Sequence, residues 1–238
     1  MGEKTTTKEA VCALCQCHIQ DNTLFTGLTD SQLDAFKDAV SFVQKKRREV
    51  VFLEGDECSG LHIIKSGRVK VVRSSSAGKE QIIKILSPGD LLGFEVLYDG
   101  TRYANTAVAM EDAELCYIGK NDFFRILERE PEISKKLIIS MGRELNQAYE
   151  KIGNLGLLNA REKLAHLLVT LAGEYGKDVL EGVQLNLTLS RLEIAELLGI
   201  TQETSIRLLK SFKEEGLIEI RRKEIIIKSM DRLKAIGG

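Results

Sequence analysis

Three cysteines stand close together near the start of the chain, and their thiols are the side chains whose chemistry is easiest to name. Cys12, Cys15 and Cys17 follow a CxxCxC pattern, and Cys58 and Cys116 are the other cysteines of this 238-residue sequence. Thiolates ligate iron–sulfur clusters and zinc, and exposed thiolates oxidise readily. The pattern therefore predicts a metal centre or a redox-responsive thiol group, and by itself it does not decide between them.

The composition indicates a folded protein without a secretion or membrane signal. Hydrophobic residues make up 43% and charged residues 29% of the chain, which is typical of globular domains. The N-terminal residues contain no apolar run of the kind a secretory signal needs, and no stretch approaches the ~20 apolar residues that span a bilayer. We therefore expect a cytoplasmic protein without a membrane partner, where clustered cysteines are more often ligands or redox groups than disulfides.

The middle of the chain has the texture of a β structure. Short apolar runs alternate there with clusters of Gly, Ser and Asp, and the runs occupy residues 50–53, 61–64, 69–72, 81–86, 106–109 and 114–118. Many short strands at this spacing predict an all-β barrel, roll or sandwich. Ahead of them, apolar residues at helical spacing predict a short helix over residues 30–43.

Beyond the β-rich part the periodicity becomes helical. A short helix is expected over residues 122–127, a long one from Pro131 and another over 160–175. Apolar residues recur along the long helix at spacings of three and four: Leu137, Met141, Leu145, Ala148, Ile152 and Leu155. Such a seam suits a partner helix and predicts dimerisation, although it can also pack on its own domain.

The last 50 residues form a separate pattern. A helix ending at Gly199 is followed by Thr201, which can cap a second helix over residues 202–215, and Gly216 ends that helix. Two β-rich runs follow, at 217–220 and 224–228, with a basic segment between them. Two helices, a tight turn and a basic hairpin predict a winged helix-turn-helix.

The second helix of this motif would read DNA with side chains near its N-terminus. We expect DNA contacts from Gln202, Glu203, Ser205, Ile206, Arg207, Lys210, Arg221 and Arg222. Glu203 and Arg207 are four residues apart and share one helix face, so Arg207 can donate to guanine and Glu203 can accept from cytosine. Arg221 and Arg222 would neutralise phosphates. The alternative is a surface helix with an i,i+4 salt bridge.

Net charge does not decide this question, because the whole chain carries only −1. A DNA-binding surface would have to concentrate its basic groups locally. From Thr188 to the end there are ten Lys and Arg against eight Asp and Glu, a surplus of two. The supersecondary pattern therefore carries the prediction of DNA binding, and the charge supports it only mildly.

The segment Ser87-Pro-Gly-Asp-Leu-Leu-Gly-Phe-Glu, the long seamed helix and the stretch LSRLEIAELLGITQETSIRLLKSFKEEGLI resemble the CRP/FNR family of transcription regulators. The resemblance implies an α+β fold with a cyclic-nucleotide-binding-type β-roll, a long dimerisation helix and a C-terminal winged helix-turn-helix. It implies a cysteine-bearing segment over residues 1–24, the roll over 25–130, the dimerisation helix over 131–158 and the DNA-binding domain over 159–238. It also implies a homodimer that binds a palindromic FNR-like DNA site, with RNA polymerase as a partner and no enzymatic activity.

The FNR branch is the most similar part of that family. The resemblance implies that Cys12, Cys15, Cys17 and Cys116 hold a 4Fe-4S cluster that senses oxygen or redox state. The chain departs from FNR in having one residue, where FNR has five, between the second and third cysteines. Other effectors stay open, namely haem or NO, a small organic ligand, zinc or thiol oxidation. A thiol oxidoreductase is disfavoured because no βαβ context surrounds the CxxC.

The resemblance also bears on the effector pocket and the DNA site. Cyclic-nucleotide pockets of the CRP type hold the phosphate with a Gly-Glu pair and an Arg-Ser pair, and the second pair reads Tyr103-Ala104 here, with Arg102 adjacent. FNR-type readers have a Ser just before the Arg, where this chain has Ile206. A half-site related to TTGAT is implied, with its outer bases open.

Overall fold

The computed structural model describes residues 29, 36, 39–98, 102–222 and 224–238. The chain divides into two compact units, residues 1–145 and 146–238, so the boundary falls within the long helix α4 (Pro131–Leu157). In the described part of the chain no helix has the length and apolar character needed to cross a membrane.

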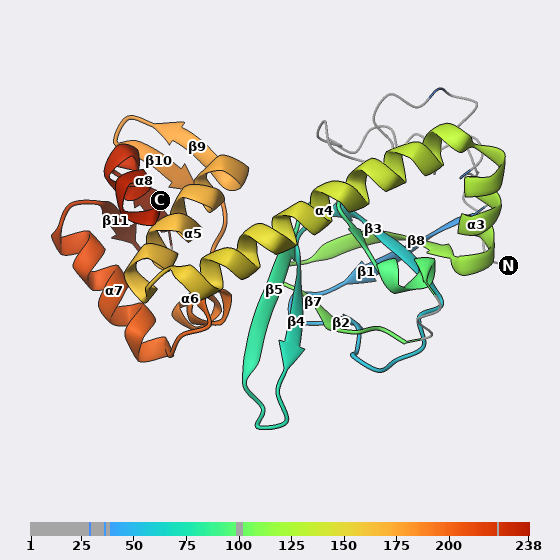
Figure 1. The fold of residues 1–238 in the computed structure, drawn as a ribbon, viewed down its shortest axis with the longest axis horizontal. Coiled ribbons are helices and arrows are strands. Elements are labelled where there is room, and N and C mark those ends of the chain that lie inside the picture. The colour runs from blue at the N-terminus through green and yellow to red at the C-terminus, as the bar shows by residue number, and fades with distance from the viewer. Residues whose placement is uncertain (1–28, 30–35, 37–38, 99–101, 223) are drawn as a thin grey trace, which may run out of the picture. The chain divides into compact units, whose positions relative to one another are not determined.

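Two antiparallel four-stranded sheets form the first unit (Figure 1). The first sheet has the order β1 (Val40–Lys45), β8 (Ala113–Gly119), β3 (Gly60–Ser66), β6 (Leu91–Leu92). The second has the order β2 (Val50–Phe52), β7 (Thr106–Ala109), β4 (Val69–Ser74), β5 (Glu80–Leu86). Each of the six apolar runs of the sequence coincides with one of these strands, which confirms the prediction of a β architecture for this part of the chain.

The strand β1 corrects one expectation. Its six residues pair with β8 in unbroken register, from Val40 opposite Ile118 to Lys45 opposite Ala113. The expected helix over residues 30–43 is therefore wrong for residues 40–43, and residues 30–35 and 37–38 lie outside the described residues. Short apolar runs fit helix and strand templates alike, and pairing with β8 decides for the strand.

Helices complete the core of the first unit. A 3-10 turn, η1 (Phe94–Leu97), follows β6, and α3 (Lys120–Arg129) follows β8. Phe123 of α3 and Ile133 of α4 are fully buried in the same apolar cluster as Ile118 of β8. The predicted helices at 122–127 and from Pro131 are thus confirmed, and the first turns of α4 belong to the core of this unit.

Leu137 belongs to that core as well, with 5% of its surface exposed. The expectation that it forms part of a dimerisation seam is therefore wrong. It lies one turn after Ile133 on the helix face that packs on its own domain. The remaining seam residues begin one turn later.

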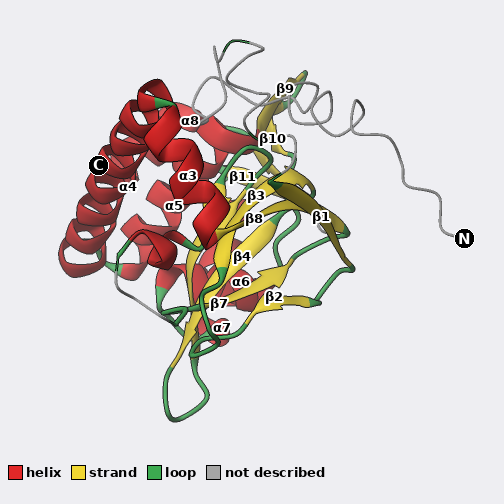
Figure 2. Ribbon diagram, turned by 90° about the vertical axis from the view of Figure 1, so that its right-hand side faces the viewer, coloured by secondary structure: helices red, strands yellow, loops and turns green. Residues whose placement is uncertain are grey.

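The second unit consists of helices and a small sheet (Figure 2). In chain order it contains α5 (Ala160–Tyr175), β9 (Gly176–Val179), β10 (Gly182–Leu185), α6 (Arg191–Leu198), α7 (Gln202–Glu214), β11 (Ile218–Arg221), β12 (Glu224–Ile227) and α8 (Met230–Gly237). The sheet is antiparallel with the order β11-β12-β10-β9. The predicted helices and hairpin are confirmed, and β9, β10 and α8 are additions that the sequence patterns did not predict.

Candidate functional site

The turn between α6 and α7 is built by its capping residues. Ser190 and Glu193 form a reciprocal capping box that begins α6, and Gly199 ends it in the left-handed conformation at φ 68°. Thr201 then caps α7 by accepting a hydrogen bond from the backbone N–H of Thr204 at 3.2 Å. Each cap satisfies helix-terminal groups that would otherwise lack partners, and together they fix where α7 begins.

Helix α7 has one buried and one exposed face. Ser205, Leu209 and Phe212 recur at spacings of four and three and are 0–1% exposed, so this face packs on the rest of the unit. The opposite face presents the other residues expected on α7, all of them exposed: Gln202, Glu203, Ile206, Arg207 and Lys210.

The expectation that Ser205 contacts DNA is wrong. Its side chain shares the buried face with Leu209 because the two residues are four apart. The hydroxyl oxygen of Ser205 is enclosed and has no hydrogen-bond partner among the described residues. A one-residue shift along a helix turns a side chain by about 100°, which is why its neighbour Ile206 is exposed and Ser205 is not.

Glu203 and Arg207 remain available to an external partner. No ion pair joins their side chains in the described structure, although they are four residues apart, and the other charged pair on this helix, Lys210 and Glu214, approaches to 3.7 Å. The alternative of an i,i+4 salt bridge between Glu203 and Arg207 is therefore not what the structure contains. Their hydrogen-bonding groups can meet base edges.

The wing hairpin presents its two arginines differently. Arg221 donates from Nε to Glu219 at 2.7 Å and from Nη2 to Glu181 at 2.5 Å. These hydrogen bonds raise the pKa of Arg221 and lower that of Glu219. Arg222 occupies the hairpin turn at φ 55° and is exposed, with no ion pair to the described residues. Of the two, Arg222 is the guanidinium that the structure leaves to an outside anion.

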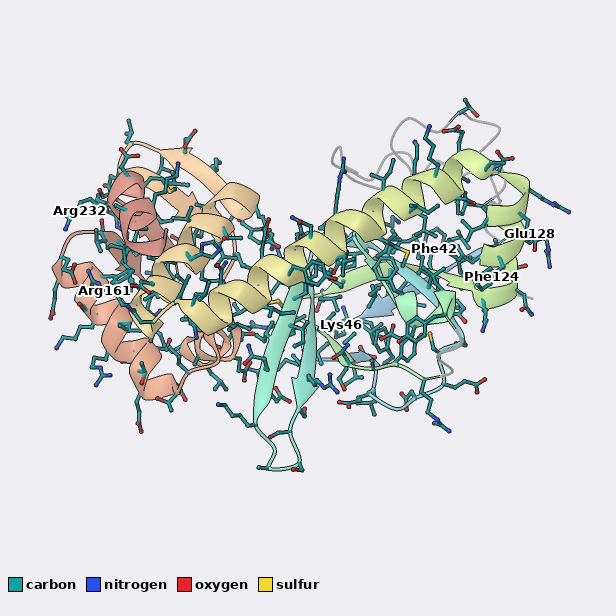
Figure 3. The ribbon with its side chains drawn as sticks, viewed as in Figure 1. Phe42, Lys46, Phe124, Glu128, Arg161 and Arg232 are labelled. Atoms are coloured by element: carbon teal, nitrogen blue, oxygen red, sulfur yellow. The ribbon has the colours of Figure 1, made fainter. Side chains whose placement is uncertain are left out.

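The C-terminal end of α7 is fixed against other helices. The guanidinium of Arg161, in α5, lies 4.9 Å from the centroid of the Phe212 ring. Arg232, in α8, donates a 3.2 Å hydrogen bond to the backbone carbonyl of Glu215, which follows α7. Figure 3 labels both arginines. Neither arginine was singled out by the sequence patterns, since each lies far along the chain from its partner. They position the recognition surface rather than form it.

The roll of the first unit is filled where a cyclic-nucleotide pocket would need space. The rings of Tyr103 and Phe52 stack with centroids 3.7 Å apart and planes 7° apart. Tyr103 is 4% exposed, its hydroxyl donates to the carbonyl of Gly60 at 3.3 Å, and its burial raises its pKa. This tyrosine is therefore a packed core residue.

The polar groups beside Tyr103 already have partners. The backbone N–H of Ala104 donates to Oε1 of Glu95 at 3.0 Å. Arg102 donates to the carbonyl of Gly55 at 2.6 Å and is exposed. Tyr103 stands where such pockets have an arginine, and Arg102 is bonded to Gly55, so a phosphate here would lack a guanidinium. A buried anion without a cationic partner is unfavourable. These residues do not fit a cyclic nucleotide.

Of the four cysteines expected to bind metal, the structure describes one. Cys116 lies in β8, directly opposite Phe42 of β1 and Ile63 of β3, and is 1% exposed. Cys12, Cys15 and Cys17 lie outside the described residues. Within the described ranges no three His, Cys, Asp or Glu side chains are placed to hold a metal ion. The ligand set therefore stays a prediction.

Two family models match the chain, one in each part. The model of the cyclic nucleotide-binding domain matches residues 42–130, and that of the Crp-like helix-turn-helix domain matches 162–236. Regulatory protein HlyX of Actinobacillus pleuropneumoniae is 32% identical over 203 residues, 85% of this chain and 83% of its own. The chain belongs to the CRP/FNR family of transcription regulators. It is a DNA-binding regulator and not an enzyme, so the thiol oxidoreductase alternative is excluded.

Further curated relatives and solved structures are similar to this chain. The anaerobic regulatory protein of Haemophilus influenzae is 30% identical, over 94% of this chain and 89% of its own. The fumarate and nitrate reduction regulatory protein of Salmonella typhimurium is 29% identical, over 94% and 92%. Among solved structures, FixK2 from Bradyrhizobium japonicum has a TM-score of 0.75 at 22% identity, over 84% of this chain and 98% of its own. A CooA mutant from Carboxydothermus hydrogenoformans has a TM-score of 0.75 at 26% identity, over 94% and 99%. The expected α+β fold of this family is confirmed.

Proposed function

We propose that this CRP/FNR regulator binds a palindromic, FNR-like duplex site as a homodimer, with α7 of each protomer in the major groove of one half-site. The observation that carries the proposal is the exposed pair of Glu203 and Arg207 on the first turns of α7, free of an ion pair with each other. Arg can donate two hydrogen bonds to guanine and Glu can accept one from cytosine. Arg222 supports the proposal as a phosphate contact in the wing.

The test is selection of binding sites from a randomised duplex pool, followed by titration of variants against the selected site. Arg207→Ala should lower affinity about tenfold to hundredfold and relax the preference at one base pair of each half-site. Arg73→Ala, which removes an exposed arginine from β4 of the roll, is the matched control and should bind as the wild type does. Equal binding by both variants would contradict the proposal.

The exposed face of α4 supports the homodimer. Beyond the core residue Leu137, Met141 is 42%, Leu145 52% and Ile152 66% exposed. With Ala148 and Leu155 they continue the three-four spacing that a second helix of the same kind would cover. A dimer also places two recognition helices on two half-sites, which is how palindromic sites are read. A second copy of this chain is therefore the proposed occupant of this face.

For the sensor we propose that Cys12, Cys15, Cys17 and Cys116 hold an iron–sulfur cluster, and that DNA binding responds to oxygen or redox state through this cluster. The cluster type to test first is 4Fe-4S. The donor set fits, because thiolates are the usual ligands of such clusters. Susceptibility to oxidation follows exposure, so the burial of Cys116 argues against a bare thiol switch at this residue. When bound, the cluster would supply the oxygen-reactive centre. The names of two relatives, an anaerobic regulatory protein and a fumarate and nitrate reduction regulatory protein, support this proposal.

Anaerobic purification, iron and sulfide assay, and an absorption spectrum before and after air test the sensor. Cys116→Ala should lose iron and sulfide, whereas Cys58→Ala should retain both. Cys58 is the matched control because it is a buried cysteine outside the proposed ligand set, with its thiol 3.9 Å from the carbonyls of Gly60 and Gly93. A colourless wild-type protein without iron and sulfide would contradict the cluster and leave the DNA-binding proposal intact. A haem spectrum or bound zinc would assign one of the other effectors.

The remaining partners follow from DNA binding. A regulator of transcription binds DNA where RNA polymerase also acts, so we propose that it contacts RNA polymerase at the bound site. For the same reason we propose that the protein is cytoplasmic. Reconstituted transcription from a promoter carrying the selected site tests this. Unchanged transcript levels over a full titration of the regulator would contradict the polymerase contact.

A further inference from the structure

One side chain on the exposed face of α7 does not fit a purely polar reading surface. Ile206 is 47% exposed, whereas Leu209 and Phe212 of the same helix are buried. Exposure of a large apolar side chain gains nothing from the hydrophobic effect, and a β-branched residue is only an average helix former. Neither packing nor helix propensity therefore accounts for isoleucine at this position.

The surroundings of Ile206 place it among the residues that meet base edges. Glu203 is three residues before it and Arg207 is the next residue, so all three lie within one sector of the helix surface. Thr201, Gln202, Glu203 and Ile206 line a hollow in the surface at the N-terminal end of α7. The hydroxyls of Thr201 and Thr204 are 2.9 Å apart, and Thr201 caps the helix. Ile206 is thus the apolar element of a face that otherwise offers hydrogen-bonding groups.

The major groove contains one apolar feature on its base edges, the 5-methyl group of thymine. We infer that Ile206 is a specificity-determining residue that reads a thymine methyl group in each half-site, beside the bases contacted by Glu203 and Arg207. The inference rests on the proposed binding of α7 in the major groove and goes further by naming the chemical group read. A cytosine at the same position would present an amino donor to the apolar side chain and leave that donor without a partner, which penalises the wrong base.

The substitution of deoxyuridine for thymidine tests this directly, because dT→dU removes the methyl group and leaves base pairing unchanged. The full-length protein, purified anaerobically, is titrated against its selected duplex, in which each dT is replaced in turn at the equivalent positions of both half-sites. Removal of one buried methyl group should weaken binding about fourfold per half-site at one dT position. The other dT positions of the half-site should show no comparable loss of affinity.

Variants of the side chain show whether Ile206 does the reading. Ile206→Ser should bind the dT and dU duplexes equally, and Ile206→Val should retain part of the difference. Because Ile206 lies on the exposed face, both variants should keep the wild-type circular dichroism spectrum and melting temperature, which distinguishes impaired recognition of the methyl group from impaired folding.

Three outcomes would overturn the inference. Wild-type protein that binds every dU duplex as tightly as the dT duplex does not touch the methyl group at all. An Ile206→Ser variant with the wild-type dU penalty shows that another side chain reads the methyl group. A selection that enriches no palindromic site overturns the proposed reading of an FNR-like site by α7 and this inference with it, so the two failures are distinguishable.

Discussion

Arg161, in the first turn of α5, holds the carboxylate of Glu215, the residue that caps the C-terminal end of α7, through two parallel hydrogen bonds. Nη1 lies 2.7 Å from Oε1 and Nη2 lies 2.6 Å from Oε2. The hydroxyl of Ser211 donates to the same Oε1 at 2.7 Å. Bidentate pairing fixes orientation as well as distance, so it positions the end of the recognition helix relative to α5.

This pair predicts an acid-sensitive step in the stability of the second unit. Hydrogen bonds from Arg161, and then from Ser211, lower the pKa of Glu215 from 4.5 to about 2. Because the ionised carboxylate favours the folded state, its contribution is complete above pH 4.5 and is lost as the pH falls toward 2. Glu215→Gln should therefore flatten the fall in stability between these pH values, measured by urea unfolding followed by circular dichroism.

Glu214→Gln provides the matched control for this experiment. Glu214 is adjacent in the chain, and its carboxylate lies 3.7 Å from the ammonium group of Lys210 on the helix surface, a type of pair that contributes little. Its loss should leave the pH dependence close to that of the wild type. Identical pH dependence in the Glu214 and Glu215 variants would show that the pairing of Glu215 with Arg161 does not stabilise the fold.

The wing should use Arg222 and not Arg221 to neutralise phosphate. Arg222→Ala should weaken binding uniformly across sequences and reduce the slope of log affinity against log salt by about 0.9 for each phosphate that is no longer neutralised. Arg221→Ala should change that slope much less, since Glu219 and Glu181 already hold its guanidinium. Affinity measured at several salt concentrations separates the two arginines. Equal slopes in both variants, or the larger change in Arg221→Ala, would contradict this assignment.

Local patterns in the sequence predict most of this fold because they record local physics. Gly199 and Thr201 mark a helix end and a helix start by their backbone and capping properties, and the structure contains both. Pro131 marks the start of α4 for a similar reason. The short apolar runs between turn residues likewise mark the strands of the roll, and in β3 five consecutive residues, 60–64, are buried.

Features that depend on distant partners are not visible in such patterns. Glu181 is 40 residues from Arg221, and Arg161 is 54 residues from Glu215. The extended conformation of residues 40–43 likewise depends on pairing with β8. Tertiary contacts therefore decided the strand and the state of each arginine. The burial of Ser205 is different, because its spacing of four from Leu209 already places both side chains on one face of α7.

The two parts of the apolar seam on α4 should respond differently to mutation. Leu137→Ala should destabilise the first unit by about 2–5 kcal/mol, because truncation of a buried leucine leaves a cavity, and should leave dimerisation unchanged. Ile152→Asp places a charge at a side chain that is 66% exposed in the protomer and should shift the protein toward monomer. Sedimentation equilibrium and urea unfolding at one protein concentration measure both effects. A dimer in Ile152→Asp as stable as that of the wild type would contradict the proposed interface.

The packed interior of the roll predicts that cyclic nucleotides do not bind. A ligand that binds and is present at about 100 times its Kd would stabilise the protein by ~2.7 kcal/mol, an effect that a melting curve resolves. Because the roll has no space for it, 3′,5′-cyclic AMP should leave the Tm unchanged. Tyr103→Ala should cost about 3–5 kcal/mol through the cavity it leaves beside Phe52. Tyr98→Ala, at a tyrosine that is 59% exposed, is the control and should have little effect. A raised Tm of the wild type with cyclic AMP would show that the Tyr103–Phe52 stack and the Glu95–Ala104 hydrogen bond open to admit a nucleotide.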